Sequence, residues 1–106
     1  MKELTLRNYI RETKKLYEKG IDLVVDRVGV SIKNIKENKR VSNKDFYYLG
    51  LVELKYFIYI CDNKDSFGMS KSICTPISIY DFCYNHLPFY PAALKDKVIK
   101  KYGDIL

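Results

Sequence analysis

Helix start and stop signals divide this chain into segments of helical length, and no other feature of the sequence constrains the fold as strongly. Apolar residues recur at helical spacing from residue 5 to residue 19, with Thr5 placed to cap the first turn and Gly20 to end the helix. A second start lies at Ser42, where Asp45 stands three residues later as in a capping box. We expect the helix that begins there to run through Leu54.

The C-terminal half also contains helix start and stop signals. Thr75 followed by Pro76 is typical of an N-cap and first helical residue, and Pro88 marks where that helix must have ended. A last helix is expected to open at Tyr90-Pro91 and to stop at Gly103. The polar, serine-rich stretch from residue 62 to residue 72 predicts a loop.

Residues 21–30 allow two interpretations, because Val24, Val25, Val28 and Val30 suit a strand as well as a short buried helix. With a helix there, the chain is a mainly α protein of about five short helices in one compact domain, residues 1–106. The alternative is an α+β fold with a β-hairpin at residues 21–41 and a strand near 54–61. In that alternative the lysines of the hairpin simply face water.

Charge and aromatic residues are segregated along the chain. The net charge is +6, and residues 1–44 hold 12 Lys and Arg against 6 Asp and Glu. In contrast, 12 of the 15 Phe and Tyr residues lie between residues 46 and 90. A basic N-terminal region attracts phosphates while an aromatic middle supplies packing, although lysine-rich surfaces also serve solubility alone.

The composition predicts a small cytoplasmic binding protein. The longest apolar stretches fall well short of the roughly 18–20 residues that a membrane-spanning helix needs, and the charged N-terminus does not resemble a signal peptide. Cys61, Cys74 and Cys83 are an odd set without a close pair, which favours reduced thiols. Abundant Lys, Ile, Asn and Tyr fit AT-rich coding, as in a phage or other mobile element.

Residues 26–35 resemble the helix-turn-helix of bacterial DNA-binding regulators. In that motif a glycine forms the turn, a serine caps the recognition helix and an aliphatic residue anchors it, and these roles would fall to Gly29, Ser31 and Ile35. Residues 10–20 are also similar to the first helix of the tetracycline-repressor family. Residues 37–42 are similar to the segment after the recognition helix of phage-repressor-like domains. The resemblance spans residues 10–49 at most.

The resemblance implies a DNA-binding transcription regulator, which we expect to act as a homodimer because one small recognition helix gives limited affinity. Asn34 suits a bidentate contact to adenine, and the basic residues suit phosphates or guanine. The implied nucleic-acid-binding residues are Arg27, Ser31, Lys33, Asn34, Lys36, Lys39, Arg40 and Lys44.

A second hypothesis is a protein-binding inhibitor or adaptor that docks on a nucleic-acid-handling enzyme through the tyrosine-rich middle. Tyrosine offers a large contact area with few rotatable bonds and a polar tip. The residues that would contact such a partner are Tyr47, Tyr59 and Phe89.

Catalysis is the least favoured class, and we expect no catalytic residue, no cofactor and no bound metal. Asp45 followed by Glu53 and Lys55 fits the bare pattern of a small metal-dependent nuclease, with a strand expected after Lys55. The three cysteines with His86 would supply zinc ligands only at spacings that no common zinc module uses.

Overall fold

The computed structural model describes residues 5–37, 39–87 and 91–103, and within these ranges the chain forms helices and no strand. The α-helices are α1 (Leu6–Lys19), α2 (Ile21–Lys36), α3 (Asn43–Gly50), α4 (Phe57–Asp62), α5 (Pro76–His86) and α6 (Pro91–Tyr102). Short 3₁₀ turns occur at Leu54–Tyr56, Lys64–Phe67 and Lys71–Ile73. None of the helices in the described ranges is long and apolar enough to cross a bilayer.

The mainly α fold expected from the sequence is confirmed, and the α+β alternative is wrong. Residues 21–36, the expected first part of a hairpin, form one helix, and residues 54–62, the expected strand, form a 3₁₀ turn followed by α4. The region expected to be a loop, 62–72, contains two of the 3₁₀ turns.

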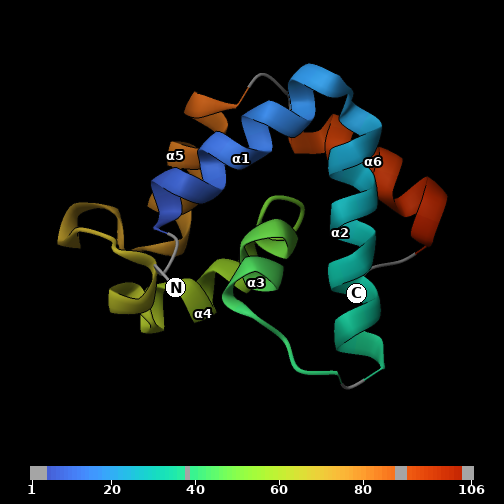
Figure 1. Ribbon diagram of the computed structural model, residues 1–106. Coiled ribbons are helices and arrows are strands. Elements are labelled where there is room, and N and C mark those ends of the chain that lie inside the picture. Colours follow the sequence, from blue (N-terminus) through green and yellow to red (C-terminus); the bar gives the residue numbers. More distant parts are fainter. Residues whose placement is uncertain (1–4, 38, 88–90, 104–106) are drawn as a thin grey trace.

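Helix α2 is the centre of the arrangement, since it packs against α1, α3 and α6. Figure 1 shows α3 between α1 and α2, with α6 crossing behind α2. From α3 the chain continues to α4, which in turn packs against α5. The core therefore lies around α3, which contributes Tyr47, Tyr48 and Leu49 with at most 1% of their surface exposed.

Local caps set most of the helix ends where the sequence predicts them. The Thr5 side chain accepts the Asn8 N–H at 3.3 Å at the start of α1, and Thr75 accepts the Ser78 N–H at 3.1 Å at the start of α5. Gly20 is the single residue between α1 and α2. Its φ of 145° is strained for any other residue, and its N–H donates to the last carbonyls of α1.

Burial explains why the valine-rich segment is a helix and not a hairpin. Val24, Val28 and Ile32 follow one another at helical spacing and are at most 5% exposed, so tertiary packing outweighs their preference for strands. The turn predicted at Gly29 is wrong, because α2 continues through this residue without interruption. Position 29 has no room for a side chain, because the ring of Tyr102 from α6 lies directly against the backbone there.

Substitution of Gly29 by Ala tests this close approach. A Cβ at position 29 would lie 2.2 Å from Cζ of Tyr102, so the ring must shift, and we expect this shift to disturb its hydrogen bond to Asp26. We expect Gly29→Ala to lower the free energy of unfolding by about 1–3 kcal/mol in urea denaturation, as overpacking does elsewhere.

The control for Gly29→Ala is the same change in a Tyr102→Ala background. With the ring absent, Ala in the middle of a helix is favoured over Gly by up to about 1 kcal/mol, so the substitution becomes neutral or stabilising. Equal destabilisation in both backgrounds would show that the ring of Tyr102 is not the reason for glycine at this position.

Candidate functional site

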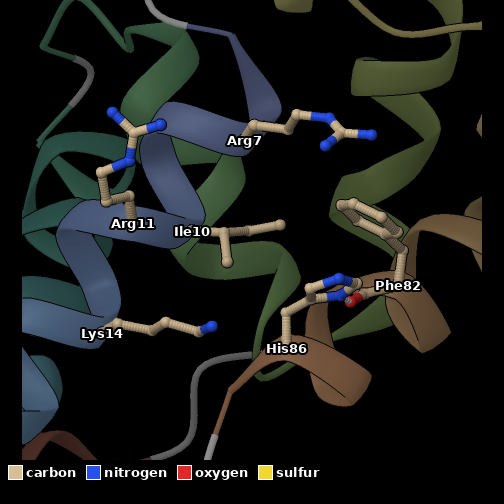
Figure 2. A pocket seen from close by; sticks show the side chains of 6 residues that line it. All are labelled: Arg7, Ile10, Arg11, Lys14, Phe82 and His86. Atoms are coloured by element: carbon tan, nitrogen blue, oxygen red, sulfur yellow. Dashed lines mark hydrogen bonds between the residues drawn. The ribbon is translucent and has the colours of Figure 1, made fainter.

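A cavity of about 220 Å³ between α1 and α5 gathers cationic and aromatic side chains. We call it the basic groove, and the residues that line it are Arg7, Ile10, Arg11, Lys14, Phe82 and His86. Figure 2 shows Arg7, Ile10 and Lys14 extending from α1 toward the two rings of α5, whereas the guanidinium of Arg11 points away from Phe82. The six lining residues include no carboxylate, thiol or hydroxyl group.

The helical geometry of α1 places the cations of the basic groove on one side. Arg7, Arg11 and Lys14 are four and three residues apart, the spacings that bring side chains together on a helix face. All three are exposed, and none forms an ion pair with a carboxylate in the described part of the chain. Their positive charge is therefore available to an external anion.

The α5 wall of the basic groove consists of two rings one helical turn apart. The centroids of Phe82 and His86 lie 4.4 Å apart with the planes inclined by 41°. Nδ1 of His86 lies 2.8 Å from the Phe82 carbonyl oxygen, and because a carbonyl only accepts, this nitrogen carries a proton. Nε2 then remains available for an outside partner. The arrangement can bind an anion and a flat apolar group together.

Three of the residues implied by the helix-turn-helix resemblance bind Asp45 of α3. Ser31 is fully buried and donates to Oδ1 of Asp45 at 2.8 Å, and Arg27 pairs with the same oxygen at 3.3 Å. Asn34 donates to Oδ2 at 3.1 Å. The Ser42 N–H donates to Oδ2 at 3.0 Å, which completes the predicted capping box. These α2 side chains therefore hold α3 in place, and Ser31 cannot lie in a DNA groove.

The hydrogen bonds to Asp45 keep its carboxylate ionised inside the protein. Burial alone would raise its pKa, but the donors from Ser42, Ser31 and Asn34 together with the charge of Arg27 outweigh burial and lower the pKa below its ordinary value. Only 2% of Asp45 is exposed. The buried charge is thus balanced by donors from two helices.

The other five predicted nucleic-acid-binding residues are solvent-accessible around the end of α2 and the start of α3. Lys39 pairs with Glu37 at 2.9 Å, and Lys44 lies 3.8 Å from Glu12. Those without an ion pair to a described carboxylate are Lys33, Lys36 and Arg40. This second basic surface has no aromatic wall among its predicted residues.

The residues predicted to contact a protein partner separate into different environments. Tyr47 is completely buried, so its prediction as a surface contact is wrong. Its ring stacks on Tyr9, and its hydroxyl lies 3.0 Å from the Thr13 hydroxyl, whose own proton is directed to a backbone carbonyl. Tyr59 is 38% exposed and stacks on Phe46 with ring centroids 3.9 Å apart. Phe89 lies outside the described residues.

The residues considered for catalysis have structural partners. Glu53 pairs with Lys95 at 3.2 Å, Asp45 is part of the buried network, and no strand follows Lys55. Cys83 is fully buried in the core. Within the described ranges, no group of three or more His, Cys, Asp and Glu side chains is arranged to hold a metal ion.

The sequence analysis did not predict the basic groove, although the cations that α1 contributes to it follow a recognisable spacing. The spacing of Arg7, Arg11 and Lys14 indicates a cationic helix face beside the apolar face of the same helix. The contribution of Phe82 and His86 depends on how α5 lies beside α1, which no local pattern records.

Asp45→Asn tests the buried network. Because the folded-state pKa of Asp45 is lowered, its charge stabilises the fold above the ordinary carboxyl pKa of about 3.8, and this contribution disappears as the pH falls through the folded-state value. We expect Asp45→Asn to lower the free energy of unfolding at pH 7 by about 2–4 kcal/mol, and the deficit to narrow in urea denaturation near pH 3.

The matched control is Asp81→Asn, whose carboxylate is exposed on α5. This change should leave the free energy of unfolding unaltered at both pH values. A deficit for Asp45→Asn that is the same at pH 7 and pH 3 would contradict an ionised role for this carboxylate.

No protein-family model matches the chain, and no curated protein or solved structure matches it either. Among the pockets lined by described residues, the basic groove brings cations without a carboxylate partner together with the rings of Phe82 and His86.

Proposed function

We propose that this protein binds DNA through the phosphate backbone, with the basic groove as the principal contact surface. The observation that carries the proposal is the set of three cations on one face of α1, exposed and without a carboxylate partner in the described chain. Arg and Lys in such a position bind phosphates and release the counterions around them, which is the main source of sequence-independent affinity.

The proposed mode differs from that of a helix-turn-helix regulator. Ser31 is buried and Asn34 donates to Asp45, so α2 offers few of the polar side chains that read base edges. Lys33 and Lys36 near the end of α2, and Arg40 in the connection to α3, add positive charge that favours the approach of a polyanion. Binding is thus expected to depend on phosphates more than on sequence.

A salt titration of DNA binding tests the proposal. Fluorescence anisotropy of a labelled mixed-sequence DNA should give an affinity that falls steeply between about 50 and 200 mM salt. The double variant Arg7→Glu with Lys14→Glu removes two phosphate contacts, so we expect at least about tenfold weaker binding at low salt. The slope of log affinity against log salt should become shallower by about 1.4–1.8.

Two further double variants serve as controls with the same change in net charge. Lys97→Glu with Lys100→Glu alters exposed residues on α6 and should leave most of the affinity intact. Lys33→Glu with Lys36→Glu measures the second basic surface. If this pair abolishes binding while the α1 pair does not, the groove is not the principal contact. An absence of binding at low salt would overturn the DNA proposal and favour a protein partner.

A further inference from the structure

The floor of the basic groove is apolar, which binding of phosphate alone does not require. Ile10 lies between Arg7 and Lys14 along α1 and points into the cavity in Figure 2. Phe82 is half-buried and presents its ring to the same space. His86 adds a second ring beside that of Phe82. These features suit a ligand that has a flat apolar part and an anionic part.

The size and charge spacing of the groove fit one unit of a nucleic-acid strand. Pockets for drug-sized ligands usually have about 300–1,000 Å³, so a cavity of about 220 Å³ suits a smaller group such as a single base. Arg7 and Lys14 are seven residues apart, which is about 10 Å along the helix axis. The rings of α5 face the space between them, so a base in the groove would have a cation on either side for its flanking phosphates.

We infer that the basic groove binds single-stranded nucleic acid, with one base against the rings of Phe82 and His86 and the adjoining phosphates on Arg7 and Lys14. The inference rests on the proposed function and specifies its ligand. In a duplex, each base face is covered by its neighbours in the stack, so only an unpaired strand can present a base to these rings. Stacking on aromatic side chains also tolerates any base, because every base has a π-face.

The decisive comparison is between a single strand with bases and an abasic strand of the same length. Both carry the same phosphates, so they differ only in what the rings can contact. We expect the strand with bases to bind about 5- to 150-fold more tightly in anisotropy titrations, the range for stacking of one base. The duplex of the same sequence should bind with an affinity close to that of the abasic strand.

Two variants remove the rings separately without changing a lysine or arginine. Phe82→Leu keeps an apolar floor, and His86→Ala changes an exposed residue and leaves the fold intact even if Phe82→Leu does not. Each should weaken binding of the strand with bases toward the abasic level and leave abasic binding unchanged. A strand containing 2-aminopurine adds a direct readout, since its fluorescence should be quenched by wild-type protein and less by either variant.

The outcomes separate this inference from the proposed function. Equal affinity for the abasic strand and the strand with bases would overturn the stacking site while leaving phosphate binding in place. Tighter binding of duplex than of single strand would also overturn it. Failure to bind any of the three probes at low salt would remove both proposals together.

Discussion

The carboxylate of Asp45 is the interaction on which the arrangement of the helices depends. It completes the N-terminal cap of α3 through Ser42 and accepts hydrogen bonds from Ser31 and Asn34 on α2. A buried charge is costly unless donors surround it, and Arg27, Ser31 and Asn34 of α2 together satisfy this one carboxylate. The same contact fixes the position of α3, around which the core of the protein is built.

The helix ends could be predicted from the sequence because they depend on local chemistry. Thr5, Ser42 and Thr75 each accept an N–H from a residue three positions later, so a short stretch of sequence contains the whole interaction. The identity of α2 could not be predicted in this way, because its valines are helical only through burial against other helices. The turn predicted at Gly29 is wrong for the same reason, since the ring that requires a glycine comes from Tyr102, far along the chain.

The candidate site likewise combines residues that are close in the sequence with residues that only the fold brings together. The spacing of Arg7 and Lys14 in the sequence indicates the cationic face of α1, but the rings that form the other wall of the groove belong to α5. Residue type alone pointed to Arg27 and Asn34 as DNA contacts, and only the position of Asp45 reveals that both bind this carboxylate within the protein. Tyrosine in an aromatic-rich segment is equally ambiguous, because Tyr47 is in the core while Tyr59 is partly exposed.

The junction at Gly20 decides how α1 turns back against α2. A single residue separates the two helices, and its backbone adopts a conformation that side-chain-bearing residues rarely adopt. A residue with a side chain would hold this conformation only with backbone strain of about 1–3 kcal/mol. Because α1 packs on α2 and also supplies the cations of the basic groove, a residue that does not line the groove contributes to the position of those cations.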